Sequence, residues 1–372
     1  MPDGEAPAAT ATRASVRTAA SPPLRSRIRL RAASLSGQIF IYFLFASFVG
    51  LVVAEVATKG GNQTGAQIMN GLQIGAIYAL IAIGYTMVYG IIELINFAHG
   101  DVFTFGAMLS VWIGALLGKV GLDVTKLATS NFAGLIAALL IIFPLTMVCT
   151  GMLGVVIERV AYRRLRNAPR LAPLITAIGM SFLLEGIMFV AAGSGNYPAQ
   201  KDDWITGIAF TIGSVRVSWP QLFVIIVAVV MMLLLQGFVR YTRMGKAMRA
   251  TAQDRDAALL SGININRTIS LTFFIGSALA AAGAVVYAIY YDLLQWNLGF
   301  RFGIIAFTAA VLGGIGNILG AGLGGFLIGL IYVFGSDLLG GQWGNSIIFA
   351  MLILVLTLRP SGLLGMRVPD RA

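Results

Sequence analysis

Residues 70–106 read NGLQIGAIYALIAIGYTMVYGIIELINFAHGDVFTFG, and this stretch decides the class of the fold. Its first part is an apolar run of about 20 residues, the length that crosses the hydrocarbon core of a membrane. Polar residues then interrupt the run at Glu93, Asn96, His99 and Asp101. A charged side chain at the centre of a membrane costs roughly 2.5–3.5 kcal/mol. These residues therefore either lie in the membrane interface or line a pathway, and both interpretations stay open.

The composition of the whole chain is that of a membrane protein. Among its 372 residues, 58% are hydrophobic and 11% are charged, whereas soluble domains carry roughly 25% charged residues. The mean hydropathy is +0.86. A net charge of +11 would suggest a nucleic-acid partner for a soluble protein, but basic cytoplasmic loops account for it here. We predict an all-α, polytopic protein of the lipid membrane that binds no nucleic acid.

Apolar segments of spanning length follow one another along the chain. We place them near 37–57, 67–91, 101–118, 132–157, 171–192, 220–239, 269–291, 303–318, 321–340 and 343–358. The segment 303–318 is short and rich in glycine, so it could form a re-entrant hairpin or a half-helix. The sequence therefore predicts about 8–10 transmembrane helices.

The late apolar segments carry a row of glycines. Gly322, Gly325 and Gly329 are spaced by three or four residues, so they share one face of a helix. Small residues on such a face allow a neighbouring helix to cross closely. We predict that these glycines serve helix packing rather than contact with a substrate.

The basic residues predict the orientation of the chain. Loops rich in Lys and Arg stay on the cytoplasmic side, which places 158–170 and 240–268 inside and 193–219 outside. The Arg-rich segment 1–36 cannot bury enough apolar surface to fold, so we expect a disordered cytoplasmic tail; an organelle transit peptide is the alternative. The domain organisation is then this tail, a transmembrane domain at 37–365, and a cytoplasmic C-terminal tail at 366–372.

The loop 240–268 contains a distinctive short segment, Asp256-Ala257-Ala258-Leu259-Leu260-Ser261-Gly262. An acidic residue at its start and a glycine at its end predict a short helix. Alanines give a helix a smooth face on which a partner can pack closely. An ordinary basic loop between two spans is the alternative interpretation.

Several polar residues within or beside the apolar segments are candidates for a translocation pathway, because polar groups in a membrane need water, a partner or a ligand. Glu185 lies well inside the segment 171–192, where a structural hydrogen bond is the favoured role. The candidates are Asn70, Gln73, Tyr85, Asn96, His99 and Glu185.

The sequence argues against an enzyme and against a bound cofactor. Cys149 is the single cysteine and His99 the single histidine, so neither a cysteine metal cluster nor the usual His-based metal site is expected. Nothing in the chain matches the phosphate-binding pattern G-x-x-x-x-G-K-[ST]. If ATP drives this protein, partner subunits bind and hydrolyse it.

Several ordered motifs together resemble the permease subunit of branched-chain amino acid ABC importers, the LivH-like hydrophobic amino acid uptake family. Within that family the chain resembles the first of two related permeases, and the similarity runs from about residue 66 to 365. The Arg-rich tail and Asp256, where a glutamate is usual, are departures. The matching stretches are YALIAIGYT at 78–86, NFAHG at 96–100, MGKAMRA at 244–250, GIN at 262–264, AFTAAVLGGIG at 306–316 and RPSGLLG at 359–365.

The resemblance implies an ABC-importer permease fold in the cell inner membrane and an ATP-driven, alternating-access mechanism. It implies a second homologous permease, two ABC ATPase subunits and an extracytoplasmic substrate-binding protein as partners. Asp256, Ala257, Ala258 and Gly262 would form the loop that couples to an ATPase. The expected substrates are leucine, isoleucine and valine, and urea or short amides are the alternative. A secondary transporter or channel is less favoured, because it would leave the coupling loop unexplained.

Overall fold

A computed structural model describes residues 24–94, 96–166, 168–169, 171–199, 204–291 and 293–365, with side chains from residue 37 onward. The parts of the expected tails at 1–23 and 366–372 lie outside the described residues. The first helix begins at Leu24, so the predicted tail boundary at residue 36 is not where helical structure starts. Once a helix has formed its first turn, each further residue adds a hydrogen bond at little cost. The segment 24–36 contains no proline that would stop this extension.

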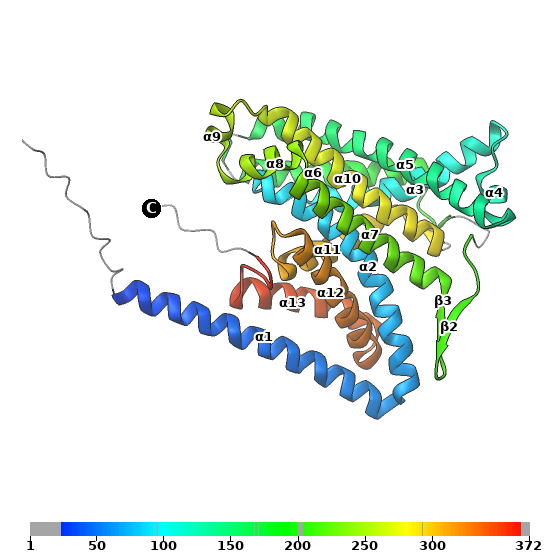
Figure 1. Cartoon of the computed structure of the whole chain (residues 1–372), viewed down its shortest axis with the longest axis horizontal. Coiled ribbons are helices and arrows are strands. Elements are labelled where there is room, and N and C mark those ends of the chain that lie inside the picture. Colours follow the sequence, from blue (N-terminus) through cyan, green and yellow to red (C-terminus); the bar gives the residue numbers. More distant parts are fainter. Residues whose placement is uncertain are drawn as a thin grey trace, which may run out of the picture.

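The described chain is almost entirely helical (Figure 1). The helices are α1 (Leu24–Lys59), α2 (Gly61–Ile92), α3 (Ala98–Lys119), α4 (Val124–Ser130), α5 (Phe132–Ile157), α6 (Leu171–Ala192), α7 (Trp219–Tyr241), α8 (Arg243–Gln253), α9 (Arg255–Leu260), α10 (Ile265–Tyr290), α11 (Leu298–Gly313), α12 (Ile318–Leu339) and α13 (Gly344–Leu358). A π-helical turn (Glu158–Tyr162) and a 3-10 turn (Arg163–Leu165) follow α5, and a 3-10 turn (Gly341–Trp343) precedes α13. The strands β1 (Tyr197–Pro198) and β4 (Leu293–Leu294) form one antiparallel pair, and β2 (Ile208–Ile212) and β3 (Val215–Ser218) form another.

Within the described residues, 9 helices are long and apolar enough to cross a membrane. This confirms the polytopic, all-α fold class and the predicted range of spans. The segment predicted at 303–318 is instead the helix α11, which has 16 residues. At 1.5 Å per residue, α11 is shorter than the hydrocarbon core of roughly 30 Å.

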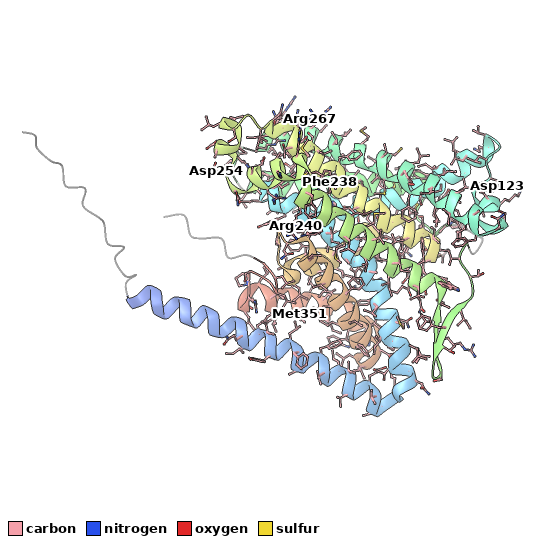
Figure 2. All side chains as sticks on the ribbon, in the orientation of Figure 1. Asp123, Phe238, Arg240, Asp254, Arg267 and Met351 are labelled. Carbon is pink, nitrogen blue, oxygen red and sulfur yellow. The ribbon has the colours of Figure 1, made fainter. Side chains whose placement is uncertain are left out.

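The helices run between two ends of the bundle. At one end, which we call the basic end, lie the loop after α5, the loop 240–268 and the end of α13. Arg166 in the loop after α5 donates to Asn266 in the loop 240–268 at 2.6 Å, and Arg359 after α13 donates to the carbonyl of Gly37 on α1 at 3.2 Å. The opposite end carries α4 and the pair β2–β3. Figure 2 shows Asp254 and Arg267 far from Asp123, which precedes α4.

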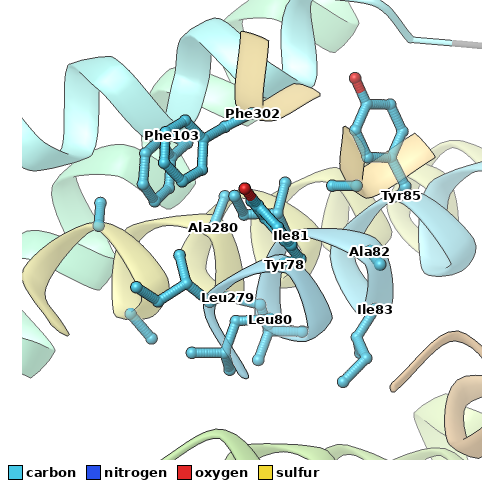
Figure 3. Packing of buried hydrophobic residues seen from close by; sticks show 14 of the residues in the cluster. Tyr78, Leu80, Ile81, Ala82, Ile83, Tyr85, Phe103, Leu279, Ala280 and Phe302 are labelled. Atoms are coloured by element: carbon cyan, nitrogen blue, oxygen red, sulfur yellow. The ribbon is translucent and has the colours of Figure 1, made fainter. Parts of the chain in front are cut away.

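Three helices form the centre of the bundle. The most apolar stretches of α2, α10 and α12 are 83%, 78% and 61% buried, whereas those of α1 and α13 are each 17% buried. Around α2 the side chains of Tyr78, Phe103 and Phe302 pack together (Figure 3), and the last two rings stack with centroids 5.3 Å apart. The outer helices therefore present their apolar side chains to lipid.

Glycines bring α2 and α12 into backbone contact. A Cβ atom on Gly329 would lie less than 3.0 Å from the backbone of Gly71 and Gly75, and one on Gly325 would meet Ala79 as closely. Gly322 instead faces the end of a side chain, the sulfur of Met232 on α7. The predicted packing role of this glycine face is confirmed, because no side chain would fit between the two helices.

Two polar contacts hold the loosely packed α1 against the bundle. At the opposite end, Lys59 Nζ lies 2.6 Å from a carboxylate oxygen of Asp337 on α12. At the basic end, Arg359 donates to the carbonyl of Gly37. Between these two contacts, the ring of Phe48 packs on that of Phe334, and Phe40 and Leu44 are buried, so α1 also contacts the bundle along its length.

We expect the substitution Gly329→Ala to destabilise the protein by about 1–3 kcal/mol, the usual cost of overpacking a tight contact. The added methyl would collide with backbone atoms of α2, which cannot rotate away. Thermal unfolding of the purified protein in detergent measures the effect. Gly186→Ala on α6 is the matched control, since a Cβ there meets nothing within 4 Å. Equal melting temperatures for both variants would contradict the packing role.

Candidate functional site

The loop at the basic end is built from short-range hydrogen bonds. The Thr242 hydroxyl accepts from the backbone N–H of Gly245 and starts α8. The Asp254 carboxylate accepts from the backbone N–H groups of Asp256 and Ala257, at 2.9 and 3.0 Å, and starts α9. Such caps satisfy the free N–H groups at the beginning of a helix. Gly262 follows α9 with a φ of 80°, a conformation that favours glycine.

The helix α9 carries apolar side chains into solvent at the basic end. Leu259 is 60% exposed and Leu260 is 90% exposed. Ala257 is exposed as well, but Ala258 is buried. The smooth alanine face expected from the sequence is therefore split, and the outward face is formed by Ala257 with the two leucines. These leucines were not among the candidates from the sequence, although they are apolar residues in a polar loop.

Arg255 attaches α9 to the bundle. Its guanidinium donates to the Ile92 carbonyl at 2.9 Å and lies 3.4 Å from the Ile91 carbonyl. These carbonyls belong to the last turn of α2, where no intrahelical donor is available. Glu93 follows with a φ of 56°. A cleft of about 380 Å³ lies beside this contact, and its charged lining residues are Glu93, Arg166, Asp254, Arg255 and Asp256.

A buried ionic cluster joins the loop after α5 to the start of α10. Glu158 is fully buried and accepts hydrogen bonds from Arg166, Arg163 and Ser270. Arg166 also donates to Asn266. Burial lowers the pKa of the Arg166 guanidinium, and the charge of Glu158 opposes this shift. Glu158 was not a candidate from the sequence, because a single acid in a basic loop gives no sign of burial.

The helix α3 starts inside the bundle rather than at its surface. After α2 ends at Ile92, the chain turns back, and the His99 ring lies 4.7 Å from the ring of Tyr85. A Cβ on Gly84 would stand less than 3.0 Å from His99 and from the Gly276 carbonyl of α10. His99 is buried, and no described residue pairs with its Nε2 atom. His99 therefore packs inside the bundle against α2. The two interpretations of these polar residues, the membrane interface and a pathway, both stay predictions.

The helix α11 begins against the first turn of α3. A Cβ on Gly100 would lie less than 3.0 Å from the backbone of Gly299 and Gly303, so the two helices touch without side chains between them. Nearby, Ser181 of α6 donates to a carboxylate oxygen of Asp101, whose Oδ1 has no partner among the described residues. Two helix N-termini thus meet within the apolar bundle.

The structure brings some of the predicted pathway residues together and separates others. Tyr85 and His99 are in contact, and Asn96 accepts a hydrogen bond at 2.7 Å from the hydroxyl of Tyr162. Asn70 is exposed at the opposite end, where Gln221 donates to its side-chain oxygen. Of the remaining two candidates, Gln73 is buried on α2, and Glu185 is half-buried on α6, one turn after Ser181, which donates to Asp101.

The described residues contain no group of three or more His, Cys, Asp or Glu side chains that could hold a metal ion. The buried polar side chains are spread over several helices, for example Gln73 and Thr86 on α2 and Asp101 and Thr104 on α3.

Comparison with known proteins identifies the family. The pattern described as "Branched-chain amino acid transport system / permease component" matches residues 67–356. The permease protein BraD of a high-affinity branched-chain amino acid transport system from Pseudomonas aeruginosa is 43% identical over 80% of this chain and 95% of its own length. LivH, which carries the same description, is 44% identical in Salmonella typhimurium and 43% identical in Escherichia coli K12, each over 80% of this chain and 94% of its own length.

A more distant relative is named for another cargo. The autoinducer 2 import system permease protein LsrD of Salmonella paratyphi B is 26% identical over 49% of this chain and 57% of its own length. The family pattern runs from within α2 to within α13. The chain therefore belongs to the permease family of branched-chain amino acid transport systems.

Proposed function

We propose that this chain is the membrane subunit of an ATP-driven ABC importer in the cell inner membrane, and that it carries leucine, isoleucine and valine. The observation that carries the proposal is α9, which exposes Leu259 and Leu260 at the basic end, outside the membrane spans. Neighbouring exposed leucines outside the spans form an apolar patch of the kind that a partner protein covers. The names of BraD and LivH support the substrate class.

The basic end faces the cytoplasm in this proposal, because Lys- and Arg-rich loops stay on that side. The N-terminus is then also cytoplasmic. Separate ABC ATPase subunits, two in each assembly, bind ATP and receive α9 in a groove on one of them. A second homologous permease completes the membrane part, and an extracytoplasmic binding protein delivers the amino acid to the opposite end.

Each residue of the coupling loop has a distinct role in this arrangement. Ala257 lies on the outward face, where a small side chain permits close docking. Ala258 anchors α9 by its burial. Asp256 stands in the first turn, where a negative charge is favourable, and Gly262 allows the chain to leave α9 sharply. Docking on the ATPase can then move the loop as one unit.

The proposed pathway follows α2 from the opposite end toward the basic end. Asn70 and Gln73 lie near the entrance, and Tyr85, His99 and Asn96 lie beyond the centre. The contact between the first turns of α3 and α11 closes the pathway in this conformation. Glu185 stands beside that contact on α6, where it can form a hydrogen bond when the helices move. ATP binding opens the pathway only if it favours one conformation over the other.

The substrate is tested by ATP-dependent uptake of labelled leucine into vesicles that contain the full assembly. We expect uptake that valine blocks and that urea and acetamide leave unchanged. Accumulation of labelled urea without any leucine uptake would keep the ATP-driven mechanism and refute the substrate. Leucine uptake that continues without ATP would refute the importer itself.

Docking of α9 is tested by the substitution Leu260→Asp. A charge in the proposed groove removes apolar burial and adds an unpaired carboxylate, so we expect at least a roughly tenfold loss of ATPase association and of uptake. Co-purification of the ATPase subunits measures the association. Leu122→Asp makes the same change on an exposed leucine near the opposite end and should leave the association intact. Wild-type association of Leu260→Asp would show that α9 is not the docking element.

The pathway is tested by His99→Phe. Phenylalanine keeps an aromatic ring against Tyr85 but removes both ring nitrogens, so hydrogen bonding is lost; thermal unfolding of the variant reports any cost of its larger ring. We expect a fall in uptake of roughly tenfold, the value of one hydrogen bond to a passing polar group. ATPase association should stay at the wild-type level. Unchanged uptake would mean that His99 only fills space in the core.

A further inference from the structure

Arg255 connects α9 to the end of α2, which lies away from the exposed leucines of α9. Its side chain leaves α9 on the inward side and ends on the carbonyls of Ile91 and Ile92. The side chain is half-buried beside the cleft at the basic end. A cation on the last carbonyls of a helix interacts favourably with the helix dipole and satisfies unpaired acceptors. The contact is therefore both electrostatic and directional.

After the end of α2 the chain turns back into the core of the bundle, where α3 begins. Among the described residues, Glu93 is the one non-glycine residue with a positive φ. Strain of this kind persists only where the surroundings enforce it, and it is often found at switch points. The chain then runs through Asn96, which is held by Tyr162, to the buried His99. A displacement of the α2 terminus would thus be passed directly to the first turn of α3.

We propose that Arg255 is a positioning residue that transmits the movement of α9 to the hinge at Glu93 and so to the contact between α3 and α11. The inference rests on the proposed function, because it assigns a mechanical path to the same coupling loop. The Glu158 cluster supports it from the other side. In this cluster Arg166 bonds Asn266, and Glu158 bonds Ser270. These bonds fix the beginning of α10, so α9 moves relative to a rigid helix.

The experiment compares variants in the full assembly in vesicles and measures uptake per ATP hydrolysed. We expect Arg255→Ala to retain ATPase association and ATP hydrolysis while uptake per ATP falls at least tenfold. Arg255→Lys keeps a charged donor and should recover part of the loss. Arg267→Ala is the matched control, since it removes the same charge from an exposed position in the same basic loop and should keep the wild-type ratio.

A second measurement does not depend on the substrate. A spin label on Glu93→Cys, in a Cys149→Ser background, reports the mobility of the hinge with and without ATP. We expect ATP to change the mobility when Arg255 is present and to leave it unchanged in Arg255→Ala. If the wild-type assembly imports no leucine but the label responds in this way, the proposed substrate fails and the role of Arg255 stands.

Two outcomes would overturn the inference. The first is an Arg255→Ala variant whose uptake per ATP and label response equal those of Arg267→Ala, because the link would then carry no movement. The second is a loss of ATPase association in Arg255→Ala, because the side chain would then act in docking rather than in transmission.

Discussion

The backbone contact between α2 and α12 is the constraint on which the rest of the structure depends. In lipid the hydrophobic effect does little to hold helices together, because the lipid tails are apolar as well. Transmembrane helices therefore associate through close packing. Gly75 and Gly329 remove the side chains that would hold the two helices apart. With α10, this pair forms a buried core around which the other helices are arranged. Larger residues at these positions would separate the helices and open the centre of the bundle.

The same closeness permits helices to begin inside the bundle. In a membrane protein, irregular backbone between the spans is tolerated only where protein or a water-filled cavity surrounds it. The first turns of α3 and α11 meet these conditions, since Gly100 and Gly299 pack against each other's backbone. Polar side chains such as His99 and Asp101 then lie in the core, where each hydrogen bond matters more than at the surface. A region with such constraints suits a gate that has two discrete arrangements.

The basic end combines a locally determined element with connections that only the fold provides. Asp254 and Gly262 define α9 within a few residues of sequence. The attachment of α9, in contrast, depends on residues far away in the chain: Arg255 reaches the end of α2, and Glu158 gathers groups from the loop after α5 and from α10. The loop is therefore a rigid unit joined to the bundle at defined points.

The sequence alone determined the membrane class, the approximate spans, the short helix in the basic loop and the glycine packing face, because run length, caps and spacing are local properties. It did not reveal that α1 begins at Leu24, that Ala258 is buried or that Asn70 lies far from His99. Nor did it reveal the burial of Glu158. These features follow from contacts between segments distant in the chain, and a one-dimensional pattern contains no record of which segments meet. Tertiary packing alone decided which polar residues share the core.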